Sequence, residues 1–240
     1  MKSRQSVKCS IISLKGRVTV KKYYPRIADK LLDISLSTAG AVLVEGPKWC
    51  GKTWTAKSTL YMQDLDERDS NMQAESIKPS LLLKGATPRL IDEWQVAPIL
   101  WDSVRHEVDK RGEVGQFILT GSTTPILDHQ ISHTGSGRIS RIKMRPMSLF
   151  ESNESNGEFS LQNLFEGQVT SGALSKLEIE DIAKVIVRGG WPASVNSSPE
   201  IGFKRAQDYV ESDLNFDVSA VEDITKNPQK MTSLLKSYSR

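Results

Sequence analysis

Residues 41–56 read AVLVEGPKWCGKTWTA and combine an apolar run with two closely spaced glycines, Gly46 and Gly51. Residues 41–44 form a short continuous apolar run, which is typical of a strand buried on both faces. A glycine-rich turn then runs from Gly46 to Gly51, and a helical pattern begins at about Lys52. The sequence therefore predicts a buried strand, a tight loop and a helix in direct succession.

The loop matches the Walker A pattern G-x-x-x-x-G-K-[ST] without a mismatch. Glycines allow backbone N–H groups to turn towards phosphate oxygens, and the dipole of the following helix favours negative charge. We expect Lys52 to reach the β- and γ-phosphates of a nucleotide, with a catalytic role, and the Thr53 hydroxyl to bind Mg²⁺. The residues expected to hold the nucleotide are Gly46, Pro47, Lys48, Trp49, Cys50, Gly51, Lys52 and Thr53.

Trp49 and Cys50 are unusual in such a loop, and each allows two interpretations. Cys50 near a helix N-terminus could be a redox-sensitive thiol with a lowered pKa, or a small residue that packs the loop. Trp49 could stack on a nucleobase or pack against the protein. Packing is the preferred interpretation for both residues.

Residues 88–94, PRLIDEW, predict a second apolar strand that ends in acids, which is how a Walker B strand is built. Asp92 is expected to hold the hydrated Mg²⁺, and Glu93 is expected to polarise the attacking water as the catalytic base. The alternative is a solvated Asp-Glu turn. Because the pair lies between the loop and another buried strand, the catalytic interpretation is favoured.

That further strand, residues 115–122, ends in Thr120-Gly121-Ser122. In a parallel sheet its end should lie beside the phosphate loop, so either Thr120 or Ser122 is expected to sense the γ-phosphate. The N-K-x-D sequence with which GTPases read guanine is absent from the chain, which favours adenine. The expected ligands are therefore ATP and Mg²⁺.

Strand and helix patterns alternate over residues 21–152, which predicts an α/β fold with a P-loop NTPase parallel sheet flanked by helices. The expected elements include helices at 25–35 and 98–111 and strands at 60–66 and from 139. Residues 1–20 show no clear periodicity and predict a mobile leader. Residues 153–240 predict a mainly helical, incomplete second domain.

The composition is that of a globular protein, with 38% apolar and 25% charged residues. No apolar run approaches the roughly 20 residues that cross a bilayer, so we expect a cytoplasmic protein without a membrane partner. The two cysteines and three histidines show no spacing typical of zinc sites or disulfide frameworks. A net charge of +3 is too small to indicate nucleic acid by itself, although basic residues cluster at 138–145.

Several strings in order resemble a prokaryotic family of AAA+-like ATPases: PRIADKLL, AVLVEGPKWCGKTWTA, PRLIDEWQ, LWDSVRHEVDKRG, FILTGS, HTGSGRI and RPMSLFES. Members of this family join an N-terminal P-loop domain to an uncharacterised C-terminal domain with a winged-helix-like part. The resemblance runs from about residue 22 to the end and implies ATP binding and hydrolysis by the residues named above. Family members continue beyond the position of Arg240, so the resemblance implies a C-terminally truncated chain.

The resemblance also draws attention to HTGSGR, residues 133–138. Arg138 is expected either to contact the γ-phosphate as a catalytic arginine finger, in cis or from a neighbouring subunit, or to form a surface salt bridge. Such fingers raise the rate by about 10³–10⁵. A finger acting from a neighbouring subunit would require a homo-oligomer. The sequence alone leaves each of these roles of Arg138 open.

The sequence thus predicts a Mg-dependent ATP hydrolase whose nucleotide state is coupled to its C-terminal domain. One alternative is a nucleotide-switched module that binds an unknown protein or DNA with little turnover. A phosphotransferase and an inactive truncated product are the remaining alternatives.

Overall fold

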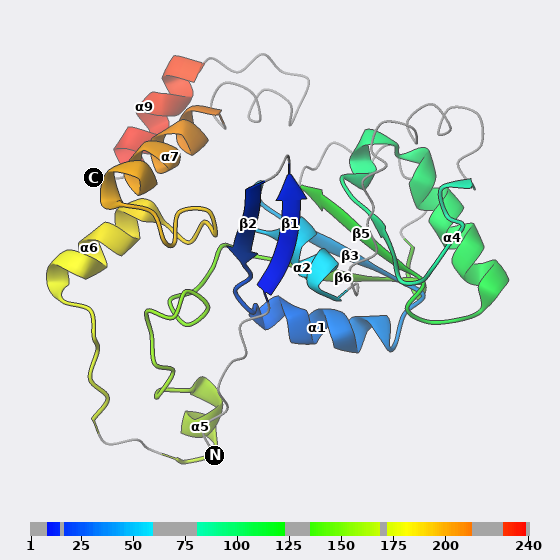
Figure 1. The fold of residues 1–240 in the computed structure, drawn as a ribbon, viewed down its shortest axis with the longest axis horizontal. Coiled ribbons are helices and arrows are strands. Elements are labelled where there is room, and N and C mark those ends of the chain that lie inside the picture. Colours follow the sequence, from blue (N-terminus) through cyan, green and yellow to red (C-terminus); the bar gives the residue numbers. More distant parts are fainter. Residues whose placement is uncertain are drawn as a thin grey trace.

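The computed structural model describes residues 9–14, 17–59, 81–122, 135–168, 172–212 and 228–238. Figure 1 shows a sheet with helices on both sides and a group of helices formed by the C-terminal residues. The fold class is an α/β, P-loop NTPase-like fold with a parallel sheet flanked by helices, as predicted.

The sheet contains four described parallel strands in the order β4-β5-β3-β6. These are β3 (Ala41–Gly46), β4 (Arg89–Ile91), β5 (Phe117–Ser122) and β6 (Ile139–Lys143). In the register of the ladder, Ala41 lies opposite both Phe117 and Ile139, and Gly46 lies opposite Ser122. The carboxyl ends of the strands therefore meet at one edge, next to the loop that follows β3.

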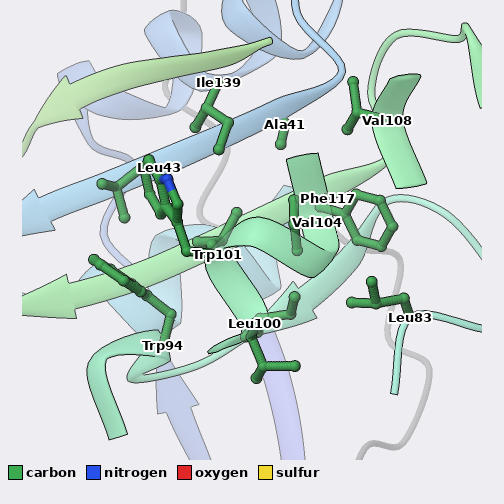
Figure 2. Close-up of a cluster of buried hydrophobic side chains, with 12 residues drawn as sticks. Ala41, Leu43, Leu83, Trp94, Leu100, Trp101, Val104, Val108, Phe117 and Ile139 are labelled. Atoms are coloured by element: carbon green, nitrogen blue, oxygen red, sulfur yellow. The ribbon is translucent and has the colours of Figure 1, made fainter. Parts of the chain in front are cut away.

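Helices cover both faces of the sheet because alternate side chains of the central strands point in opposite directions. Val42 and Val44 face α1 (Ile27–Leu36) and α2 (Lys52–Thr59), and Cys50 belongs to the same buried cluster. The opposite face packs against α4 (Ile99–Arg111) and the short helix η2 (Trp94–Val96). Figure 2 shows this second cluster, whose members include Ala41, Leu43, Leu83, Trp94, Leu100, Trp101, Val104, Val108, Phe117 and Ile139.

Most of the predicted elements are confirmed within one or two residues, including both helices and the strands at 41–44 and 115–122. The strand predicted at 88–94 is shorter and ends at Ile91. The strand ends there because the backbone turns: Glu93 adopts a left-handed conformation with φ of 52°, which an extended strand does not allow. The strand predicted at 60–66 lies outside the described residues.

Within residues 1–20, where the sequence shows no clear periodicity, the structure describes strand residues at 9–14 and from 17 onwards. Strands β1 (Cys9–Leu14) and β2 (Arg17–Lys22) pair in antiparallel register, with Cys9 opposite Lys22 and Leu14 opposite Arg17. Both strands are rich in β-branched residues, which favour extended backbone. Residues 1–8 lie outside the described part of the chain.

The described residues after 153 are mainly helical, as predicted. Their described helices are α5 (Leu161–Phe165), α6 (Ile179–Arg188), α7 (Pro199–Ser212) and α9 (Pro228–Tyr238). None of the described helices is long and apolar enough to cross a bilayer.

A buried arginine fastens these helices to the end of the α/β part. Arg188, the last residue of α6, donates to both carboxylate oxygens of Glu154, at 2.9 and 2.8 Å, and to the Val195 carbonyl oxygen at 3.1 Å. Burial raises the pKa of Glu154, but the hydrogen bonds from Arg188 and Ser152 outweigh it and hold the pKa below its usual value. The Arg188–Glu154 pair thus fixes the start of the helical part.

We expect Arg188→Met to destabilise the chain by about 2–4 kcal/mol, because it removes the charged partner of the half-buried Glu154 carboxylate and leaves it only the hydrogen bond from Ser152. Lys184→Met is the matched control, since Lys184 forms an exposed pair with Asp181 on the same helix. The control should change stability by less than about 1 kcal/mol. Urea unfolding followed by circular dichroism measures both, and equal losses would contradict the structural role given to Arg188.

Candidate functional site

The loop between β3 and α2 takes a shape that only glycine allows at two positions. A Cβ atom at Gly46 would lie 2.4 Å from the Met144 carbonyl oxygen, so the end of β3 can approach that backbone only without a side chain. Gly51 has φ of +103°, a conformation that other residues rarely adopt. The two glycines of the sequence pattern therefore allow the backbone conformation of this loop.

Lys52 places its ammonium group inside that loop. The residue is only 5% exposed, and its Nζ donates to the carbonyl oxygens of Gly46 at 3.1 Å and Pro47 at 3.0 Å. A positive charge thus lies within the loop, directly at the N-terminal end of α2, where the helix dipole is also positive. Such a combination attracts anions, and phosphate groups above all.

The predicted metal-binding residues, Thr53 and Asp92, meet although 39 residues separate them in the chain. The Thr53 hydroxyl donates to Asp92 Oδ1 at 2.8 Å. These are hard oxygen groups of the kind that Mg²⁺ prefers, and Mg²⁺ bound with nucleotides takes few ligands from the protein. The pair fits such an ion, although no group of three or more His, Cys, Asp or Glu side chains among the described residues is placed to hold a metal ion.

Thr120, on the neighbouring strand β5, holds the two acidic residues Asp92 and Glu93 in place. Its fully buried hydroxyl donates to Asp92 Oδ1 at 2.5 Å and accepts from the backbone N–H of Glu93 at 3.2 Å. Ser122 lies at the end of β5, opposite Gly46 and partly exposed. The Thr120 hydroxyl is therefore engaged with the acids, whereas the Ser122 hydroxyl lies at the edge of the loop.

Glu93 is exposed and lies at the same edge of the sheet. Its carboxylate accepts a hydrogen bond from the side-chain amide of Gln95, which also donates to Ser122 Oγ at 3.2 Å. Sequence reasoning missed Gln95. The only signal was the glutamine of the string PRLIDEWQ.

Arg26 is a second site-forming residue that sequence reasoning missed. It is 7% exposed, and its guanidinium donates to the Cys50 carbonyl oxygen at 2.7 Å, the Arg145 carbonyl oxygen at 2.8 Å and Glu151 Oε1 at 3.0 Å. Burial raises the pKa of Glu151, but hydrogen bonds from the Ser148 and Ile27 backbones and the charge of Arg26 outweigh it and lower that pKa. The Glu151 carboxylate therefore stays charged, and its pair with Arg26 holds the loop in place.

The structure favours packing for Cys50, whereas Trp49 stays largely exposed and makes one ring contact. Cys50 is fully buried, and burial raises the pKa of its thiol more than Lys52 and Arg26 lower it, so the thiol is not activated. Trp49 has φ of 63° and is 61% exposed. Its ring meets the Tyr209 ring of α7 edge-on, with 5.5 Å between the centroids.

Arg138 does not belong to this site, which corrects the expectation of a finger acting in cis. It precedes β6 at the opposite edge of the sheet, where its carbonyl oxygen accepts from the Ala41 N–H at 3.1 Å. From Ala41 to Gly46 the strand rises about 16 Å, at about 3.3 Å per residue. Arg138 Nε instead donates to Asp109 of α4 at 2.5 Å, a contact that lowers the pKa of that aspartate. His133 and Thr134 of the same string lie outside the described residues.

Residues 38–153 match the model of a protein family described as an AAA domain. No curated protein matches the chain. The matched residues contain all four strands of the parallel sheet, the glycine-rich loop and the acid pair, and they end before α5. This part of the chain is thus similar to an AAA domain, the kind of domain found in nucleotide-binding P-loop ATPases.

Proposed function

We propose that the chain binds Mg-ATP at residues 46–53 and hydrolyses it to ADP and phosphate. The observation that carries this proposal is the convergence of Lys52, Thr53, Asp92 and Glu93 at the carboxyl edge of one parallel sheet. They comprise a buried cation, a pair of metal-binding oxygens and an exposed carboxylate. The transfer of a phosphoryl group to water requires a loop and a helix dipole that bind the phosphates, and acidic residues that hold the metal ion and orient the water.

In this mechanism Lys52 exchanges the Gly46 and Pro47 carbonyl oxygens for β- and γ-phosphate oxygens when the nucleotide enters. Thr53 and Asp92 would hold Mg²⁺, which supplies neutralisation of phosphate charge when bound. Glu93 orients a water and accepts its proton as the water oxygen bonds to the γ-phosphorus. The bond between the γ-phosphorus and the bridging oxygen breaks, and ADP leaves with that oxygen.

Ser122 is the better candidate for sensing the γ-phosphate. The Thr120 hydroxyl is already hydrogen-bonded to Asp92 and to the backbone of Glu93, so its role is to hold these two residues in place. Ser122 lies two residues further along β5, level with Gly46. The preference for adenine continues to rest on the sequence alone.

The contacts of Trp49 support coupling between the nucleotide site and the C-terminal helices. Tyr209 of α7 lies between two tryptophans, 5.5 Å from Trp49 of the loop and 4.3 Å from Trp191, measured between ring centroids. Pro192 also approaches the loop, because a Cβ at Gly51 would lie 3.4 Å from its Cγ. A change of loop conformation would therefore reach α7 directly.

The alternative of a DNA-binding module gains no support from the basic residues of 138–145. Arg138 is paired with Asp109, and Arg141 donates to Glu45 at 3.0 Å. Acidic partners thus offset two of the charges that would attract phosphates of a nucleic acid. Failure of the hydrolysis experiment below would favour a binding module or an inactive product.

Lys52→Ala should weaken Mg-ATP binding by about 10–150-fold, because it removes charge-assisted hydrogen bonds to phosphate worth about 1.5–3 kcal/mol. Glu93→Gln should keep the Kd within a few-fold and lower kcat by about 10²–10⁴. Calorimetry measures the first change, and phosphate release measures the second. The controls, Lys57→Ala on α2 and Glu180→Gln on α6, replace exposed residues and should match the parent. A folded parent that neither binds nor hydrolyses ATP contradicts the proposal.

Arg138→Ala should leave kcat within about two-fold of the parent, because its side chain lies at the far edge of the sheet, bonded to Asp109. The measurement is steady-state hydrolysis over a range of protein concentrations. A loss of about 10³–10⁵ would instead show that Arg138 acts as a finger on a neighbouring subunit. In that case the specific activity of the parent should rise with protein concentration.

Tyr209→Ala should change the Kd for Mg-ATP at least about three-fold, since coupling between two sites is reciprocal and α7 contacts the loop through this ring. Mg-ATP should also change the tryptophan emission of the parent, and Trp49→Phe should abolish that change. Tyr238→Ala, which removes an exposed tyrosine of α9, is the control. Identical Kd values for Tyr209→Ala and Tyr238→Ala would rule out coupling through α7.

A further inference from the structure

We infer that Gln95 is a positioning residue that joins the base Glu93 and the hydroxyl of Ser122 into one hydrogen-bonded unit; this inference rests on the proposed ATPase function. The side-chain amide has two N–H donors. One is directed to Glu93 Oε2 and the other to Ser122 Oγ, 3.2 Å away. Gln95 thereby connects the two groups that would face the attacking water and the γ-phosphate.

The link matters because the sheet itself does not connect these groups. The ladder between β4 and β5 ends at the pair Ile91 and Leu119. Beyond it, the Glu93 backbone is held by Thr120, but this bond leaves the carboxylate of Glu93 free to rotate. Gln95 supplies the missing restraint on the carboxylate, from a position two residues along the chain.

The surroundings of Gln95 are shaped for this arrangement. Gly121 provides the space, because a Cβ there would lie 2.6 Å from Gln95 Oε1 and 2.8 Å from Trp94 Nε1. The glycine of the string TGS therefore lets the glutamine side chain lie across the end of β5. Trp94 is buried and anchors the short helix η2 that carries Gln95.

Gln95 also carries an unpaired polar atom, which indicates a role other than stability. Its Oε1 is buried and has no hydrogen-bond partner among the described residues. Turning the amide over would not help, because the oxygen would then face the carboxylate of Glu93. The site tolerates a buried, unpaired oxygen and retains the two donors, as expected where the donors serve the chemistry.

An uncharged amide suits the task of orienting a base. It fixes the carboxylate near Ser122 without neutralising its negative charge, so the carboxylate can still accept a proton from water. Glu93 is exposed and would otherwise sample several rotamers. A displacement of about 1 Å of a catalytic group can cost on the order of 10²-fold in rate.

The test replaces Gln95 by methionine, which is similar in length and cannot donate. Gln95→Met should bind Mg-ATP with a Kd within about two-fold of the parent, measured by calorimetry. Its rate constant for phosphate release in a single turnover should fall at least about ten-fold. The melting temperature should stay within about 3 °C, because the variant also removes the unpaired oxygen.

The decisive comparison is the double variant Gln95→Met with Glu93→Gln. If Gln95 acts through Glu93, the double variant is no slower than Glu93→Gln alone, because the base that Gln95 positions is already absent. Gln162→Met is the matched control, since Gln162 donates to a glutamate in the same way, at 2.9 Å, but on α5. It should match the parent in Kd and kcat.

Each other outcome overturns the inference. A Gln95→Met variant with the kcat of the parent, or a faster one, shows that Gln95 does not position the base. A further rate loss in the double variant shows that it acts on something other than Glu93. A parent without ATP turnover overturns the proposed function and this inference together, and the parent's own assay distinguishes that result from the first two.

Discussion

The buried ion pair between Arg26 and Glu151 holds together three segments that are far apart in sequence. Arg26 precedes α1, Glu151 follows β6, and the guanidinium between them also binds the carbonyl oxygen of Cys50 in the loop. Burying two charges is unfavourable unless further hydrogen bonds satisfy them. Here the backbone N–H groups of Ile27 and Ser148 complete the shell of the carboxylate. The loop is therefore held not only by its own glycines but also by a contact from a residue outside its pattern.

Parallel strands give the sheet two chemically different edges. At the carboxyl edge, the ends of β3, β4 and β5 bring together Lys52, Asp92 and Ser122, so charge and hydroxyl groups gather there. The amino edge carries Arg138 in a surface ion pair with Asp109. Arg138 therefore lies about one strand length from the site, because the two edges are separated by the length of the strands.

The C-terminal helices are tied to the α/β part at more than one point. Arg188 forms a bidentate salt bridge with Glu154, and Tyr209 packs between Trp49 and Trp191. Aromatic contacts of this kind contribute about 0.5–1.5 kcal/mol beyond their buried area. The salt bridge fixes where the helices begin, while the aromatic contacts join them to the loop itself. In the proposed function, these contacts are the route by which a change at the loop would act on α7.

The strand–loop–helix unit of residues 41–59 and the acidic end of β4 could be predicted from the chain alone. These features depend on local patterns: apolar runs, glycines at fixed spacing and a helix that begins where the loop ends. The other assignments needed the folded arrangement. It distinguished Thr120 from Ser122, removed Arg138 from the site, and revealed Arg26 and Gln95. Those assignments depend on strand register and on contacts between distant segments, which local sequence patterns do not encode.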